Sequence, residues 1–278
     1  METKNIILAG YGVVGSKLLP LLQSRSYVNV MYGIDPVEEK RKRLDRLGVS
    51  SYKRIEDIPK KHTKDINVVV DCSTKGEGRK NKVIYERMSL PAIFQSGEEI
   101  SLAPLYFPEK YQSDNTSLYL RICTCSGIST MRILSALEKL SRPISVRGHH
   151  YKINNEDRMI DTNYTSGKEI EQLFDIPARI SRLYLRGESK NGYVYASNMQ
   201  ISLKDRIPER NLIEALSQGR NIRIVRDGLD TLTSVERHSD IEIVEESIQS
   251  HGRSLELMSL CYPPEVDFPE ILMAIKLF

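Results

Sequence analysis

The sequence is poor in several features that would assign a chain to a specialised class of protein. None of its 278 residues is tryptophan, and only four are cysteine: Cys72, Cys123, Cys125 and Cys261. These cysteines show neither C-x-x-C nor another spacing typical of zinc ligands, so we expect no metal site. No apolar run approaches the ~18 residues of a membrane-spanning helix, so we expect no membrane partner. Few cysteines and no secretory signal predict a protein of the reducing cytoplasm.

The charge balance excludes a strongly basic surface of the kind that binds nucleic acid. Lysine and arginine number 40 and the acidic residues 37, which gives a formal net charge of +3. Nucleic-acid binding would need clustered basic charge, so we expect no such partner. The length of 278 residues is enough for a sizeable core and, we predict, for two domains.

A short apolar strand, a glycine turn and an apolar helix follow one another between Asn5 and Leu22. The turn has the pattern G-x-G-x-x-G and consists of Gly10, Tyr11, Gly12, Val13, Val14 and Gly15. In such a unit the first glycine permits the tight turn, the second lets the backbone approach a pyrophosphate, and the third lets the helix pack closely. The pattern therefore predicts a dinucleotide cofactor at the N-terminus of the helix.

The next predicted strand, Val28–Ile34, ends in Asp35. A carboxylate at this place accepts hydrogen bonds from the ribose hydroxyls of NAD and repels the 2′-phosphate of NADP, so we expect NAD. The basic run 40–43 in the following helix leaves NADP possible. The alternative interpretation is an ordinary glycine turn, with Asp35 as the N-cap of that helix.

Strands and helices alternate through the first half of the chain. The continuous apolar run Ile66–Val70 is typical of a strand buried on both faces of a parallel sheet. The fold class is therefore predicted to be α/β, with an N-terminal Rossmann-type doubly wound sheet. Loops at the carboxyl ends of such strands line the cofactor crevice, which adds five residues to the predicted cofactor site. They are Ser73, Thr74, Gln95, Ser96 and Gly97.

The second half has a different pattern. Alternating stretches such as Ile144–Tyr151 and Val194–Leu203 predict an antiparallel sheet, and the helices 128–140 and 209–216 are expected on one of its faces. This half is therefore predicted to form an α+β catalytic domain.

Cys125 is the candidate nucleophile because it lies in a strand-to-helix turn. A helix N-terminus lowers a thiol pKa, so we expect the pKa of Cys125 below the ~8.5 of a free thiol. The same N–H groups hold an oxyanion. Oxidation of an aldehyde through a thiohemiacetal needs such a thiolate, a base and a nicotinamide. The alternative is a buried, inert cysteine.

Several motifs of the chain, in consistent order, resemble those of the archaeal-type glyceraldehyde-3-phosphate dehydrogenases. They are the glycine turn, Val69–Asp71, Phe94–Glu98, Arg121–Cys125 with Arg132–Leu134, and Glu245–Ile248 with Leu257 and Met258. The resemblance is that of a divergent, shortened member. It implies a dinucleotide-binding domain over 1–124 and 253–278, a catalytic domain over 125–252, a C-terminal helix that returns to the first domain, and a homo-oligomer.

The chain departs from this family around the predicted nucleophile. Ser126 and the three residues after it replace the family's N-T-T-G, and its H-H-G-P segment with the general base has no counterpart. Neighbouring strand residues face opposite sides, so we expect one of His150 and His149 to face Cys125. That histidine would accept the thiol proton as the base near neutral pH. Arg147 and Ser126 are the candidates for binding an anionic small-molecule substrate. The alternative is that both histidines lie at the surface or at the edge of the core and that Arg147 pairs with a surface carboxylate.

Three functions remain open from the sequence. The first is an NAD(P)-dependent aldehyde or semialdehyde dehydrogenase that uses Cys125. The second is an imine or carbonyl reductase, because His149–Lys152 and Ser166–Lys168 resemble elements of dihydrodipicolinate reductases. The third is a non-catalytic relative that binds NAD.

Overall fold

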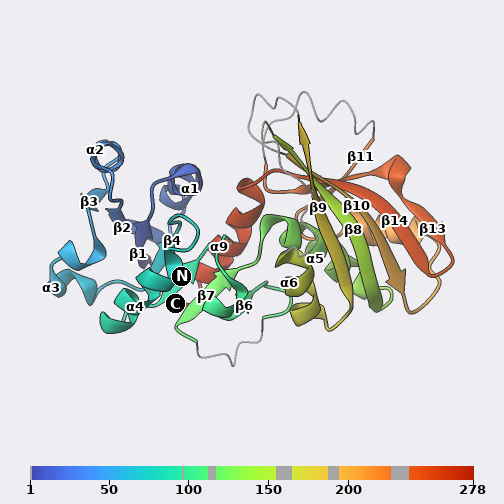
Figure 1. The fold of residues 1–278 in the computed structure, drawn as a ribbon, viewed down its shortest axis with the longest axis horizontal. Helices are drawn as coiled ribbons and strands as arrows, with labels where there is room; N and C mark the ends of the chain where they lie inside the picture. The colour runs from blue at the N-terminus through green and yellow to red at the C-terminus, as the bar shows by residue number, and fades with distance from the viewer. Residues whose placement is uncertain (1, 96, 112–116, 155–164, 187–193, 227–237) are drawn as a thin grey trace. The chain divides into compact units, whose positions relative to one another are not determined.

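The computed structural model describes residues 2–95, 97–111, 117–154, 165–186, 194–226 and 238–278. The chain forms two compact units (Figure 1). The first unit contains Met1–Cys123 and Phe268–Phe278, and the second contains Thr124–Asp267. Among the described residues, no helix is both long and apolar enough to cross a membrane.

The first unit is built on a seven-stranded sheet in which every neighbouring pair is parallel. In chain order its strands are β1 (Lys4–Ala9), β2 (Val28–Ile34), β3 (Ser50–Tyr52), β4 (Val68–Asp71), β5 (Ala92–Phe94), β6 (Leu105–Tyr106) and β7 (Tyr119–Ile122). Their order across the sheet is β3-β2-β1-β4-β5-β7-β6, so the winding direction reverses between β1 and β4. This confirms the predicted Rossmann-type doubly wound sheet, whose ligand crevice lies at such a reversal.

Helices and short 3-10 turns complete the first unit. They are α1 (Val13–Gln23), α2 (Glu38–Arg46), η1 (Ile55–Asp57), α3 (Lys60–Thr63), α4 (Gly78–Arg87), η2 (Ile100–Leu102) and α9 (Phe268–Ile275). The C-terminal helix α9 packs on β5 and β7, as the resemblance implied. All four residues of β4 are buried, which agrees with a central strand covered on both faces.

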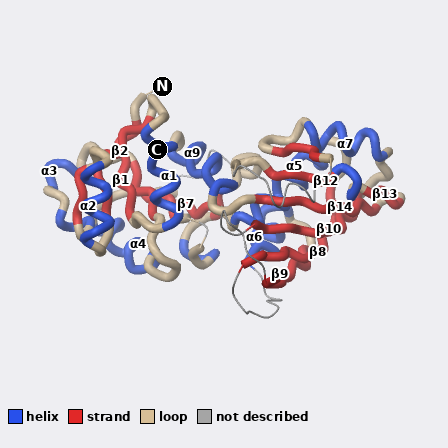
Figure 2. The backbone as a smooth tube through the Cα atoms, turned by 90° about the horizontal axis from the view of Figure 1, so that it is seen from above, coloured by secondary structure: helices blue, strands red, loops and turns tan. Residues whose placement is uncertain are grey.

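The second unit is built on a mixed sheet. Its strands are β8 (Pro143–Asn154), β9 (Ala178–Arg186), β10 (Val194–Leu203), β11 (Ile222–Val225), β12 (Ile241–Val244), β13 (Gln249–His251) and β14 (Ser254–Cys261). Their order is β11-β12-β14-β10-β8-β9, with β13 on β14. Figure 2 shows β12, β14, β10, β8 and β9 in this order. The expectation of an antiparallel sheet was wrong for two pairs, because β8–β9 and β11–β12 are parallel. Helix α6 (Thr165–Phe174) lies between β8 and β9 in the chain, and a crossover of this kind permits parallel pairing.

One face of this sheet is covered by helices. They are α5 (Cys125–Glu138), α6 and α7 (Glu209–Ser217), and two 3-10 turns, η3 (Glu245–Ser247) and η4 (Glu265–Asp267), follow β12 and β14. Burial alternates along β10: Ser197 and Met199 are buried, whereas Asn198 and Gln200 are exposed. The sheet therefore has an inner face toward the helices and an outer, exposed face.

The C-terminal boundary of the predicted cofactor domain differs from the structure. The prediction placed 253–278 with the dinucleotide domain, but the second unit continues to Asp267. The reason is β14, which was not recognised as a strand of the catalytic sheet and pairs with β10 and β12.

The glycine turn offers a test of packing. A Cβ atom on Gly15 would lie 2.1 Å from the backbone oxygen of Gly10, whereas a Cβ on Gly12 would meet nothing within 4 Å. We expect Gly15→Ala to lower the free energy of unfolding by about 1–3 kcal/mol through overpacking. Gly12→Ala should cost less than about 1 kcal/mol. Urea unfolding of both variants measures the difference, and equal stabilities would contradict this account of the turn.

Candidate functional site

The glycine turn joins β1 to α1, and each glycine has a separate role. Gly10 has a φ of +87°, and its N–H donates to the backbone oxygen of Ile34 at the end of β2 (2.7 Å). Gly15 is the point of closest helix packing, as described above. Gly12 is the N-cap of α1 and leaves open space where its side chain would be. This is the arrangement that lets a pyrophosphate approach the backbone.

The side chain of Asp35 contacts this turn. Its carboxylate accepts hydrogen bonds from the N–H of Tyr11 and from the N–H of Val37, both at 2.9 Å, and is almost fully buried. Lys40 Nζ lies 3.5 Å from the same carboxylate. Asp35 therefore connects the glycine turn with the residue before α2. It is not the N-cap of that helix, as the alternative interpretation had it, because the N-cap is Val37. Tyr11, Val13 and Val14, which were predicted to contact the cofactor, lie within the turn and the start of α1, and Val13 is exposed.

The loops after β4 and β5 lie at the same edge of the sheet because these strands are parallel neighbours. They carry Ser73, Thr74, Gln95 and Gly97, whereas Ser96 lies outside the described residues. Asp71 is held by the Ser73 N–H (2.9 Å) and the Tyr85 hydroxyl (2.8 Å), so it is a structural carboxylate.

Glu98, the last residue of the Phe94–Glu98 motif, is a buried residue of this edge whose role the sequence analysis did not state. Its carboxylate accepts from the N–H groups of Gly76 (2.9 Å) and Gly78 (3.1 Å), and its backbone oxygen accepts from Nε of the buried Arg121 (2.8 Å). Glu98 therefore ties the loop after β4 to the loop after β5. Its place directly after Gly97 was the available signal.

Cys125 is the first residue of α5, three residues before the predicted start of that helix. Thr124 is the N-cap, and its hydroxyl accepts a hydrogen bond from the Gly127 N–H (3.2 Å). Cys125 is partly exposed, whereas Cys72, Cys123 and Cys261 are buried.

The expected low pKa of Cys125 was wrong. The thiol lies in a largely buried environment, which raises its pKa well above the ordinary value, with further contributions from Asp267 and Cys261. Arg182 and a backbone hydrogen bond from Ser126 oppose the rise. Loss of hydration thus exceeds the stabilisation that a helix N-terminus gives to a thiolate.

Glu169 of α6 is a second buried residue that the sequence analysis missed. Its carboxylate accepts from the Thr124 N–H (2.9 and 3.1 Å) and from the Thr124 hydroxyl (2.6 Å). A Cβ on Gly127 would lie 2.4 Å from the same carboxylate, so only glycine fits there. The first turn of α5 therefore already has an acidic group beside it, in the place where a helix favours an anion.

The two histidines face opposite sides of β8, as predicted. His149 is exposed and hydrogen-bonds the Ser181 hydroxyl on the outer face. His150 is fully buried on the inner face and hydrogen-bonds the Ser197 hydroxyl. Burial, together with Arg182 and His149, lowers the pKa of His150 to about 3. The expectation of a histidine base near neutral pH was therefore wrong for His150, which is a weak base in this environment.

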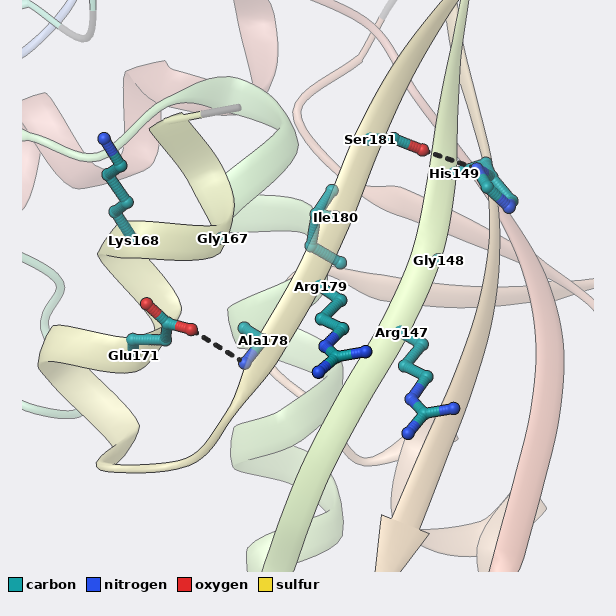
Figure 3. A pocket seen from close by; sticks show the side chains of 10 residues that line it. All are labelled: Arg147, Gly148, His149, Gly167, Lys168, Glu171, Ala178, Arg179, Ile180 and Ser181. Atoms are coloured by element: carbon teal, nitrogen blue, oxygen red, sulfur yellow. Dashed lines mark hydrogen bonds between the residues drawn. The ribbon is translucent and has the colours of Figure 1, made fainter. Parts of the chain in front are cut away.

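Arg147 was predicted to bind substrate, but it lies on the outer face of β8, opposite to His150. Figure 3 shows its guanidinium beside that of Arg179, its neighbour across the strands. Both line an open cavity of about 500 Å³ at the edge of the sheet, to which Lys168 and Glu171 of α6 also contribute. Strand alternation thus separates Arg147 from the inner face.

Ser126, the other predicted substrate residue, is fully buried, and its hydroxyl lies 3.3 Å from that of Ser166 in α6.

Arg182 is a cation of the inner face that the sequence analysis did not single out. It is the direct neighbour of His150 across the β8–β9 pair. Its charge lowers the pKa of His150 and acts in the same direction on Cys125. Its guanidinium lies over the rings of Tyr195 (5.5 Å) and Tyr184 (5.9 Å). Side chains alternate along β9, and Arg179 and Arg182 are three positions apart. Once Arg179 is on the outer face, the alternation therefore puts Arg182 on the inner face.

Comparisons with known proteins agree with the fold. No family model matches the sequence. The glyceraldehyde-3-phosphate dehydrogenase of Sulfurisphaera tokodaii is 20% identical over 99% of this chain and 92% of its own length. That of Pyrobaculum neutrophilum is 22% identical over 97% of this chain and 90% of its own. The likeness to archaeal-type glyceraldehyde-3-phosphate dehydrogenases over nearly the whole chain is thereby confirmed.

A solved structure of aspartate semialdehyde dehydrogenase II from Vibrio cholerae superimposes with a TM-score of 0.74. It covers all of this chain and 97% of its own, at 15% identity. This likeness shows the shared two-domain α/β fold.

The low pKa of His150 generates a prediction about stability. The unfolded chain binds a proton to this residue below about pH 6.5, whereas the folded chain stays neutral there until about pH 3. The contribution of His150 to stability is therefore complete above pH 6.5 and declines as the pH falls, by about 2 kcal/mol at pH 5.

We expect His150→Gln to remove this part of the decrease in unfolding free energy between pH 7 and pH 5. Urea unfolding at both pH values measures it, with the exposed His149→Gln as the matched control. The same pH dependence in wild type and His150→Gln would show that the imidazole is not buried in neutral form.

Proposed function

We propose that the protein is an NAD(P)-dependent oxidoreductase that oxidises an aldehyde or semialdehyde through a thiohemiacetal on Cys125. The observation that carries the proposal is the position of Cys125 at the first residue of α5, directly after the last segment of a dinucleotide-type sheet. The names of the relatives support it, since each describes an enzyme that acts on an aldehyde. The proposal includes a homo-oligomer, which follows from the resemblance alone, and a cytoplasmic location, which follows from the small number of cysteines.

The residues of the first unit suit a dinucleotide. Gly12 leaves space against the start of α1, and Asp35 is fixed beside the turn by the Tyr11 N–H. In the proposal these groups hold the pyrophosphate and the adenosine ribose, and the loops after β4 and β5 flank the nicotinamide. The bound cofactor supplies a hydride acceptor.

The chain's own residues would prepare the substrate in the second unit. The Cys125 sulfur attacks the aldehyde carbon, and the first N–H groups of α5 are donors for the resulting oxyanion. Arg182 is the candidate for an anionic group of the substrate, because it acts on Cys125 from the inner face. Glu169 beside the same helix turn disfavours a phosphate there. The proposal therefore favours a substrate whose anionic group is bound by Arg182 rather than by the start of α5.

Two alternative functions are supported by particular observations. A non-catalytic NAD-binding relative is favoured by the raised pKa of Cys125 and the low pKa of His150. An imine or carbonyl reductase that uses the histidine pair is less well supported. His149 lies on the outer face, and His150 is bonded to Ser197 in a buried setting.

Cofactor preference follows from Asp35 and Lys40. We expect wild type to bind NAD more tightly than NADP, because the carboxylate accepts from ribose hydroxyls and repels a 2′-phosphate. Asp35→Ser should shift the ratio toward NADP by roughly tenfold, since it leaves Lys40 without its carboxylate neighbour. Fluorescence titration with both cofactors measures this, and Gly12→Val should bind neither. Tighter binding of NADP by wild type would reverse the assignment of Asp35.

The role of Cys125 has a separate test. Cys125→Ser should lose turnover of every aldehyde that wild type oxidises while its affinity for cofactor stays the same. Iodoacetamide should label Cys125 ahead of the three buried cysteines, and its rate should still rise above pH 9 because the pKa is raised. Cys72→Ser is the control. Retained turnover in Cys125→Ser would favour the reductase, and no turnover in wild type would favour the cofactor-binding relative.

A further inference from the structure

We propose that the cavity beside β8 and β9 binds a phosphate monoester, at a ligand site separate from the proposed substrate and cofactor sites. It is the cavity of about 500 Å³ drawn in Figure 3, and all its lining residues belong to the second unit. Arg147 and His149 line it from the face of β8 opposite to the buried His150. The site makes no use of Cys125, so this inference goes beyond the proposed function and does not depend on it.

The first argument is a pair of guanidinium groups in the cavity. Arg147 and Arg179 are direct neighbours across β8 and β9, and both side chains are exposed. Figure 3 shows the two guanidinium groups beside each other. In the part of the chain that the structure describes, no carboxylate forms an ion pair with either arginine. Like charges opposite each other on neighbouring strands repel, and an anion bound between them offsets this repulsion.

The second argument is that the carboxylates around this pair have other hydrogen-bond donors. Among the described residues that line the cavity, the acidic one is Glu171, and its carboxylate accepts from the Ala178 N–H (3.2 Å). Figure 3 shows the Glu171 side chain directed toward Ala178. On the other side of Arg147, Gln200 of β10 donates to the Glu256 carboxylate of β14 (3.1 Å). Neither carboxylate neutralises the arginine pair.

The third argument is the charge and size of the cavity, which favour one class of ligand. The lining has three cations, Arg147, Arg179 and Lys168 of α6. The Glu171 carboxylate leaves a net charge of +2 when His149 is neutral. A phosphate monoester carries about −1.5 to −2 at pH 7, and its oxygens accept bidentate hydrogen bonds from a guanidinium. The volume is that of a small-molecule site, so it has room for the organic part of the ester.

Titration of the full chain with glycerol 3-phosphate tests the proposal, because this ester has no aldehyde for Cys125 to attack. Isothermal titration calorimetry should show binding that Arg147→Gln and Arg179→Gln each weaken by roughly 10- to 100-fold, since each loses charge-assisted hydrogen bonds. Glycerate, with one carboxylate in place of the phosphoryl group, should bind at least about tenfold more weakly than the ester. The matched control is Arg253→Gln, which removes an exposed arginine of the same unit outside the cavity and should leave binding unchanged.

Two further variants separate a specific site from a general attraction of charges. Arg147→Lys keeps the charge but loses the planar pair of donors, so it should still weaken binding by about tenfold. Glu171→Gln should strengthen binding by about two- to threefold, because it removes a negative charge and keeps an oxygen for the Ala178 N–H. Both arginines are exposed, so their variants should keep the wild-type midpoint of urea unfolding.

Wild-type affinity in Arg147→Lys, or an equal loss of affinity in Arg253→Gln, would show a diffuse effect of charge and overturn the proposal. Absence of ester binding in wild type would overturn it as well. So would a change of oligomeric state in Arg147→Gln with ester binding intact, since the arginine pair would then contact a second copy of the chain. None of these measurements needs aldehyde turnover, so failure of this site and failure of the proposed function are distinguishable.

Discussion

The hydrogen bonds between Glu169 and Thr124 are the constraint on which the candidate site depends. The two residues are 45 positions apart, and three contacts of 2.6 to 3.1 Å join α6 to the N-cap of α5. The Thr124 hydroxyl also accepts a hydrogen bond from the Gly127 N–H. These contacts fix the backbone around Cys125. In the proposed function Cys125 is the nucleophile, and a nucleophile must be held in a defined orientation.

Burial determines the electrostatics of the Cys125 thiol. It raises the pKa of Cys125 well above the ordinary value, and the Asp267 charge adds to this rise. The Glu169 carboxylate lies beside the start of the same helix, where a helix stabilises an anion. A rule drawn from isolated helices predicted a thiolate, but it left out the loss of hydration that the fold imposes on this thiol.

This contrast shows what the sequence was able to predict. The glycine turn, the strand β2 and the apolar strand β4 follow from local periodicity and spacing. The turn and β2 lie as expected, and β4 begins two residues later than predicted, at Val68. Glu169 and Arg182 were missed because their roles arise from contacts between elements far apart in the chain. The parallel pairing of β8 with β9 was missed for the same reason, since no local pattern records the partner of a strand. Arg147 was proposed from its residue type as a substrate-binding residue, whereas strand alternation puts it on the exposed face of β8.

The raised pKa of Cys125 does not by itself separate an inert cysteine from a catalytic one. A thiol that passes its proton to a base while its sulfur attacks a carbonyl does not become a free thiolate. Burial disfavours the free thiolate, but it does not oppose a proton transfer that is coupled to attack on a carbonyl. It does reduce the fraction of thiolate when no aldehyde is bound, and oxidants react with the thiolate. A thiol held in this way would remain reduced at rest and become nucleophilic only together with its substrate.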